Sequence, residues 1–191
     1  MASHLPYQPL PLEVPAGHIL IRQDETAHAL WEVVSGAFTE RVRDAEGRSL
    51  VLDVAGPGQV TGGLPGRPAR WEVQALRAGS VRAWTGPIES AACRWAERSG
   101  EVAFQLAWLD VAGRLERRLE DLAERFGVPV PGGVRIALPL THEELASLVG
   151  ATRESVSRAM SSLRAAGRVR TNGRGRIVLS SPLHLVRGPD A

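Results

Sequence analysis

The sequence predicts an α+β protein with three parts: an N-terminal antiparallel β-roll, a central helical region and a C-terminal winged helix-turn-helix. Three patterns lead to this prediction. Short strand-like runs separated by turn residues occupy positions 12–84, apolar residues then recur at helical spacing, and a capped helix-turn-helix pattern begins at Thr141. We therefore expect the roll within residues 1–87, helices over 88–134 and the helix-turn-helix domain over 135–191.

The predicted strands of the roll are five to seven residues long and read HILIR, LWEVVSG, AFTERVR, SLVLDVA, WEVQAL and SVRAW. The residues between several of these runs have the chemistry of turns. Turns are expected at Asp24–Glu25, Ser35–Gly36, Glu46–Gly47 and Gly56–Pro57–Gly58. Short strands at such regular spacing are typical of an antiparallel roll or barrel.

The central region carries two apolar stripes. The first is heptad-like and consists of Ile88, Ala92, Trp95, Val102, Leu106 and Leu109, with Ser99 at the intervening position. Ser99–Gly100 leaves open whether this stripe lies on one long helix or on two short ones. The second stripe consists of Leu115, Leu119, Leu122 and Phe126. Residues 127–133 contain two prolines and are expected to form a linker or turn.

The C-terminal pattern begins with a capping box. Thr141 and Glu144 are spaced so that each side chain can satisfy a backbone N–H of a new helix. Gly150 is suited to end that helix, and Thr152 can cap a second helix that closes near Gly167. The sequence RVRTNGRGRIVL then predicts a hairpin, with Asn-Gly as its turn and arginines at its tip.

The charge is unevenly distributed along the chain. All 23 basic residues are arginine. Residues 1–134 hold 14 arginines against 17 acids, a net charge of −3, whereas residues 135–191 hold nine arginines against four acids, a net of +5. A basic C-terminal domain on an acidic body is the electrostatic pattern of a DNA-binding module.

The run LASLVGATRESVSRAMSSLRAAGRV resembles the DNA-binding segment of the cyclic-AMP receptor/fumarate-nitrate regulator (Crp/Fnr) family. This resemblance implies that Arg153, Glu154 and Arg158 read base edges in the major groove. Their chemistry suits that role, because arginine can donate two hydrogen bonds to guanine and a carboxylate can accept one from cytosine. Glu154 and Arg158 are also four residues apart on a helix, so the acid can hold the arginine in place.

The resemblance extends from Val14 to Leu179 and implies a homodimer that binds a roughly palindromic stretch of double-stranded DNA. In this family the long helix is the dimer contact, so residues 88–134 are expected to be dimerisation and connecting helices. The family also implies RNA polymerase as a partner and activation of transcription, although the residues alone do not distinguish an activator from a repressor. The expected DNA-contacting residues are Thr141, Thr152, Arg153, Glu154, Ser157, Arg158, Arg164, Arg174 and Arg176.

The N-terminal part resembles the cyclic-nucleotide-binding-like roll of the same family, but it departs from the nucleotide cassette. Members that bind cyclic AMP carry G-E-L followed by R-S or R-T. This chain has Gly62–Gly63–Leu64 and Ala69–Arg70 at those places. We therefore expect no nucleotide cofactor, although Arg67 or Arg70 could meet a phosphate. The alternative is a ligand-gated regulator that holds a small effector, or a haem on His18 or His28.

Other classes of protein are disfavoured. A cupin enzyme would need two histidines one residue apart, and no catalytic triad, phosphate-binding loop or metal-ligand cluster is visible, so we expect neither catalysis nor a metal. The single cysteine, Cys93, excludes a disulfide framework within one chain. No apolar run approaches ~18 residues, and the N-terminus lacks the order of a signal peptide. A cytoplasmic location is therefore expected.

Overall fold

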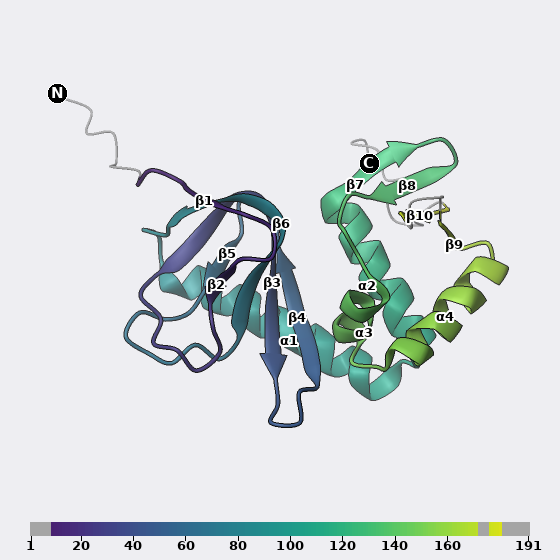
Figure 1. The fold of residues 1–191 in the computed structure, drawn as a ribbon, viewed down its shortest axis with the longest axis horizontal. Coiled ribbons are helices and arrows are strands. Elements are labelled where there is room, and N and C mark those ends of the chain that lie inside the picture. The colour runs from purple at the N-terminus through teal and green to yellow at the C-terminus, as the bar shows by residue number, and fades with distance from the viewer. Residues whose placement is uncertain (1–8, 172–175, 181–191) are drawn as a thin grey trace. The chain divides into compact units, whose positions relative to one another are not determined.

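The computed structural model describes residues 9–171 and 176–180 (Figure 1). These residues form two compact units. The first unit contains the described residues up to Glu40 together with Val54–Ala91. The second contains Arg41–Asp53 together with the described residues from Ala92 onwards. A hairpin of the roll, Arg41–Asp53, is thus part of the same unit as the C-terminal helices.

The roll is an antiparallel sheet of six strands. The hydrogen-bonded path runs β1-β6-β3-β4, with β2 paired to β6 and β5 paired to β3. Its core includes the fully buried Val33, Phe38, Val73 and Val81. The predicted antiparallel roll is therefore confirmed. The strands are β1 (Leu12–Val14), β2 (Ile19–Ile21), β3 (Leu30–Arg43), β4 (Ser49–Ala55), β5 (Val60–Gly62) and β6 (Glu72–Ala83).

The turn predicted at Ser35–Gly36 is wrong, because β3 runs through this pair without a break over 14 residues. Gly36 has a φ of +92°, which a residue with a side chain rarely adopts. A Cβ on Gly36 would lie 2.7 Å from the Cα of Gly79 on β6. The glycine therefore permits a close approach of two strands rather than a reversal of the chain.

Two long helices follow the roll. Helix α1 (Ile88–Trp108) is continuous through Ser99–Gly100, which settles the question that the sequence left open. Helix α2 (Val111–Phe126) begins after Asp110, whose Oδ1 accepts a hydrogen bond from the N–H of Gly113 at 2.8 Å. The stripe predicted on α2 is buried, as expected for a helix packed on a core. Its members are Leu115, Leu119, Leu122 and Phe126.

The linker predicted at residues 127–133 is instead mainly a hairpin, formed by β7 (Gly127–Val130) and β8 (Gly133–Ile136). It pairs with β10 (Ile177–Leu179), which pairs with β9 (Val169–Thr171), to give a sheet of order β7-β8-β10-β9. The paired strands of the predicted wing are thus present. The Asn172–Gly173 turn and Arg174 lie outside the described residues. Helices α3 (His142–Val149) and α4 (Arg153–Ala165) lie between the two hairpins in the sequence (Figure 1).

Within the described residues, the helices are all too short or too polar to cross a membrane.

Candidate nucleic-acid interface

Helices α3 and α4 are joined by a tight turn with a cap on each helix. Thr141 Oγ1 accepts a hydrogen bond from the N–H of Glu144 at 3.1 Å, and Thr152 Oγ1 accepts from the N–H of Ser155 at 3.2 Å. Gly150, with a φ of +59°, ends α3 in the left-handed conformation. A serine or threonine cap is typically worth ~1 kcal/mol to a helix. These local signals make a helix-turn-helix.

The second half of the predicted capping box is wrong. The Glu144 carboxylate accepts from Arg41 Nη2 at 2.6 Å, and Arg41 is only 7% exposed. On the next turn of α3, Ser147 Oγ lies 2.7 Å from Ser49 Oγ. Arg41 and Ser49 belong to the β3–β4 hairpin, so this hairpin anchors α3 within the second unit. Sequence spacing gave no signal for either contact.

Helix α4 buries one face and exposes the other. Its apolar residues pack against α2 and α3 and are Val156, Ala159, Met160 and Leu163. Burial of this stripe turns the polar residues of the helix outward. The remaining face is polar and exposed, as expected for the second helix of a helix-turn-helix.

The three residues expected to read bases lie on the exposed face. Arg153, Glu154 and Arg158 are all exposed. The N–H of Glu154 itself and the Thr152 hydroxyl hold the pKa of the Glu154 carboxyl below its ordinary value, so this group is an ionised hydrogen-bond acceptor at neutral pH. Arg158 Nη2 donates to Ser155 Oγ at 2.9 Å. Among the described residues no ion pair joins Arg158 to Glu154, so the predicted four-residue pairing is replaced by the contact with Ser155.

The other expected contact residues differ in how exposed they are and in whether their side chains bind their own helix. Thr141 and Thr152 are exposed caps. Ser157 Oγ donates to the carbonyl of Arg153 at 3.0 Å, and Arg164 Nε donates to the carbonyl of Met160 at 3.1 Å, so both are partly engaged with their own helix. Arg176 is exposed beside β10. The structure thus gathers Thr152, Arg153, Glu154, Ser157, Arg158 and Arg164 on or beside α4.

Two arginines of the predicted wing have structural partners. Arg168 forms ion pairs with Glu116 and Glu120 of α2, and hydrogen bonding to Glu116 raises the pKa of Arg168. Arg170 Nη2 donates to the carbonyls of Pro131 and Gly132, at 3.2 and 2.8 Å. These contacts hold β9 against α2 and the β7–β8 turn.

A buried ionic cluster connects α1, α2 and β4 in the second unit. Its centre is Asp53, which is 1% exposed and accepts from Arg94 at 2.6 Å and Arg125 at 3.1 Å. Nearby, Arg118 donates to the carbonyls of Val51 and Leu52, and burial lowers the pKa of Arg118. Pairing with Arg94 and Arg125 offsets part of the cost of burying the Asp53 carboxylate. Arg94, Arg118 and Arg125 thus join the two helices to β4, a role that could not be predicted from their helical spacing.

Comparison with known proteins identifies the family. A model of the Crp-like helix-turn-helix domain matches residues 113–187. A CRP-like cAMP-activated global transcriptional regulator of Mycobacterium tuberculosis is 29% identical over 189 residues, covering 90% of this chain and 84% of the relative. The regulatory protein CysR of Synechococcus elongatus is 33% identical over 164 residues, covering 80% of this chain and 77% of CysR. The chain belongs to the Crp/Fnr family.

Membership of the Crp/Fnr family makes the protein a transcription regulator with a DNA-binding helix-turn-helix. The family members matched are regulators rather than enzymes. The fold agrees with this assignment. A transcriptional regulator of the CRP/FNR family from Thermus thermophilus has a TM-score of 0.78 at 23% identity, over 90% of this chain and 94% of that chain.

The loop at Gly63, where the sequence departs from the Crp/Fnr nucleotide cassette, packs closely against the preceding turn. A Cβ on Gly63 would lie 2.8 Å from the Cβ of the buried Ala27. A residue with a side chain would therefore fit at position 63 only if its neighbours moved. The loop is also hydrogen-bonded to the preceding turn through its backbone. The N–H of Ala27 donates to the carbonyl of Arg67 at 2.9 Å, and the N–H of Ala69 donates to the carbonyl of Glu25 at 2.8 Å. Arg67 and Arg70 are exposed beside this loop.

Proposed function

We propose that the protein is a homodimeric, sequence-specific transcription regulator that inserts α4 into the major groove and needs no cyclic AMP. The observation that carries the proposal is the exposed polar face of α4, which is held rigid by its caps and by burial of the opposite face. We also propose a functional division into a roll (1–87), dimerisation and connecting helices (88–134) and a DNA-binding domain (135–191).

The chemistry of α4 supports direct readout of bases. Arg153 and Arg158 present guanidinium groups that can donate to guanine O6 and N7, and the ionised Glu154 can accept from cytosine N4. Contacts to phosphate would come from the remaining predicted residues, because hydroxyls, arginines and helix N-termini are the usual phosphate ligands. In this proposal those residues are Thr141, Thr152, Ser157, Arg164, Arg174 and Arg176.

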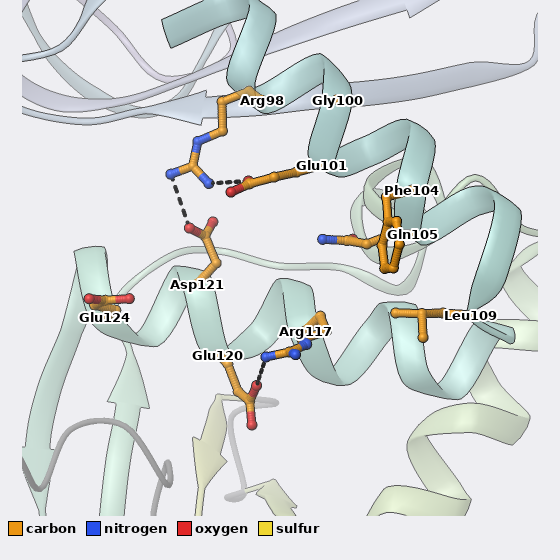
Figure 2. A pocket seen from close by; sticks show the side chains of 10 residues that line it. All are labelled: Arg98, Gly100, Glu101, Phe104, Gln105, Leu109, Arg117, Glu120, Asp121 and Glu124. Atoms are coloured by element: carbon orange, nitrogen blue, oxygen red, sulfur yellow. Dashed lines mark hydrogen bonds and ion pairs between the residues drawn. The ribbon is translucent and has the colours of Figure 1, made fainter.

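The dimer proposal is supported by the surface of α1. Of its 21 residues only Ala91 and Val102 are buried, whereas Phe104 is 62% and Trp108 is 76% exposed. A cleft of about 570 Å³ lies between α1 and α2, and Phe104 is one of the residues that line it. Figure 2 shows the ion pairs from Arg98 to Asp121 and Glu101 in the same cleft. Large exposed apolar side chains on one helix indicate a protein interface. A second copy of the same helix is the partner that symmetry favours.

Independence from cyclic AMP is supported by the residues that replace the cassette and by the close packing at Gly63. A nucleotide needs a partner for its phosphate and an acceptor for its ribose hydroxyl, and Gly63 and Ala69 supply neither. Burying a phosphate without its charged partner costs several kcal/mol, which would remove useful affinity. In this respect we propose that the chain differs from the M. tuberculosis relative, which is named as cAMP-activated. We also propose that the protein activates transcription together with RNA polymerase.

The test begins with selection of bound fragments from genomic DNA, followed by a gel shift on the selected site. We expect nucleotide-free protein to bind a roughly palindromic site as a dimer, and millimolar cyclic AMP to leave its affinity unchanged. Transcription in vitro with RNA polymerase then distinguishes activation from repression. Failure to bind any fragment contradicts the proposal as a whole, whereas a strong cyclic-AMP dependence contradicts only its effector independence.

Ligand gating is the alternative. A cleft in the first unit is lined by Leu20, Glu25, His28 and Trp31, among others, and its volume is about 270 Å³. Ligand pockets usually measure ~300–1,000 Å³, so this cleft suits at most a very small effector. Equilibrium dialysis with candidate effectors and an absorption spectrum for haem would decide between the two proposals.

A further inference from the structure

Helices α1 and α2 are joined by only two residues, Leu109 and Asp110, but they do not pack tightly along their length. The cleft of about 570 Å³ lies between them. Because side chains leave this space open, the angle between the helices depends on the contacts that cross from one to the other. Figure 2 shows one such contact, an ion pair of 3.2 Å from Arg98 on α1 to Asp121 on α2.

The buried carboxylate of Asp53 on β4 binds both helices as well. Its Oδ2 accepts from Arg94 Nη1 of α1 at 2.6 Å, and its Oδ1 lies 3.1 Å from Arg125 Nη1 of α2. Arg125 also pairs with Asp121, which leads back to Arg98. These five residues, the Asp53 cluster, therefore bridge α1 and α2 twice, once through Asp53 and once through Asp121. All five belong to the second unit.

The Asp53 cluster is sensitive to the loss of either carboxylate. Asp53 is 1% exposed, and the side chains of its three arginines are only 16–21% exposed. Charges in such surroundings are screened much less than charges on the surface. Without one acid, guanidinium groups from the two helices would face each other across the cluster. Repulsion between these like charges would then act on the angle between α1 and α2.

Helix α2 carries the helix-turn-helix with it. The apolar face of α4 packs against α2. Arg114 Nε of α2 donates to the carbonyl of Val149 at the end of α3, at 2.8 Å. Beyond α4, Arg168 pairs with Glu116 of α2. A change in the direction of α2 relative to α1 would therefore move α4 as well. The Asp53 cluster thus lies between the proposed dimer helix and the recognition helix.

We propose that the Asp53 cluster determines which half-site spacing the dimer accepts, an inference that rests on the proposed dimer and its binding of DNA. In a symmetric dimer, the separation of the two recognition helices has to match the separation of the half-sites. That separation depends on the angle at which α2 leaves α1. Each base pair added between half-sites moves them ~3.4 Å apart. A braced dimer therefore selects one spacing, whereas a loosened dimer tolerates several. Asp53 and Asp121 are positioning residues that act through α2.

The experiment measures dissociation constants for the selected palindromic site, for versions with one or two base pairs added or removed at its centre, and for an isolated half-site. The principal variant is Asp121→Asn, which removes the charge that bridges to Arg98. The matched control is Glu101→Gln, because Glu101 pairs with the same arginine at 2.9 Å but lies on the same helix. Asp121→Glu keeps the charge at this position.

Asp53→Asn tests the centre of the Asp53 cluster. Sedimentation and thermal unfolding show whether each variant is a folded dimer. Because Asp53 is almost fully buried, its variant is the one most exposed to loss of folding. The Asp121 side chain is 22% exposed, so Asp121→Asn provides the test even if Asp53→Asn does not fold.

We expect the wild type, Glu101→Gln and Asp121→Glu to prefer one spacing. In Asp121→Asn and Asp53→Asn, the ratio of the affinities for the best and the altered spacings should fall about tenfold, since couplings within proteins typically change affinity about 5- to 150-fold. Affinity for the isolated half-site should stay unchanged, because α4 keeps its own packing. This last result separates a role in positioning from a general loss of structure.

A folded, dimeric Asp121→Asn protein with the wild-type spacing preference overturns the inference. An equal loss of preference in Glu101→Gln or Asp121→Glu, or an equal loss of affinity for the isolated half-site, also overturns it. So does a wild-type dimer that binds all spacings alike, although DNA binding then stands. Absence of a dimer or of DNA binding in the wild type would instead overturn the proposed function.

Discussion

Helices α1 and α4 both bury a narrow edge and leave a long face exposed, but the exposed faces differ in chemistry. On α4 the exposed residues include Arg153, Glu154 and Arg158. On α1 they include the large apolar side chains of Phe104 and Trp108. Polar and charged groups remain solvated until a partner of complementary charge arrives. Exposed apolar surface costs ~25 cal/mol per Å², which favours burial against another protein.

The difference shows that backbone geometry alone does not select a partner. Both segments are regular helices, yet one presents ionised donors and acceptors suited to base edges and the other presents aromatic rings suited to a protein interface. The following predictions test whether the two faces have these separate roles.

The largest expected effect is on the oligomeric state. The double variant Phe104→Glu/Trp108→Glu places carboxylates in the proposed dimer contact, where they would be buried without a partner. We expect the dimer dissociation constant to rise at least ~100-fold, since each 1.4 kcal/mol corresponds to a factor of ten. Sedimentation measures the change. The matched control Ser161→Glu, on the exposed face of α4, should remain dimeric and lose DNA binding. A double variant that stays dimeric would show that this face of α1 is not the dimer interface.

The next effect is on base reading. Arg153→Ala and Glu154→Ala should each cost ~1–3 kcal/mol at the cognate site and relax the preference at one base pair, because a base contact carries sequence information. Affinities for a panel of single-base variants of the site measure this loss. Arg22→Ala, an exposed arginine of the first unit, is the control and should bind as the wild type does. Retention of full selectivity in both α4 variants would contradict the assignment.

A smaller and less selective effect is expected at the wing. Arg174→Ala and Arg176→Ala should weaken binding to all sequences about equally, because a phosphate contact carries no base information. Each lost contact should lower the salt slope by ~0.9 per phosphate. Titration of specific and random DNA at several salt concentrations measures both quantities. A loss confined to the cognate sequence would assign the wing to base reading instead.

The smallest effect is on stability. Thr152→Ala removes the hydroxyl that accepts from the N–H of Ser155, and should lower the free energy of unfolding by ~1 kcal/mol. Denaturant unfolding followed by circular dichroism measures it. Ser162→Ala, an exposed position on α4 without a capping role, is the control. If both variants lower the free energy of unfolding by the same amount, the Thr152 cap does not stabilise the N-terminus of α4.

Features that depend on neighbouring residues were predictable from the sequence. The caps at Thr141 and Thr152, the helix end at Gly150 and the buried stripe of α2 all follow from spacings of three or four residues. The family resemblance of the α3–α4 region was visible for the same reason, since a helix-turn-helix is a short contiguous motif. The alternation of strands and turns likewise predicted the antiparallel roll.

Features that depend on distant partners were decided only by the tertiary structure. The Glu144 carboxylate binds Arg41, which is 103 residues away in the chain, instead of completing the expected capping box. It does so because an almost buried guanidinium requires a charged partner. Ser35–Gly36 is part of a strand because β6 passes close to it. Gly63 lies against Ala27, and His142 meets Ser157 only once α3 packs against α4. Local preferences determine which elements form, whereas packing determines which polar groups and small residues finally meet.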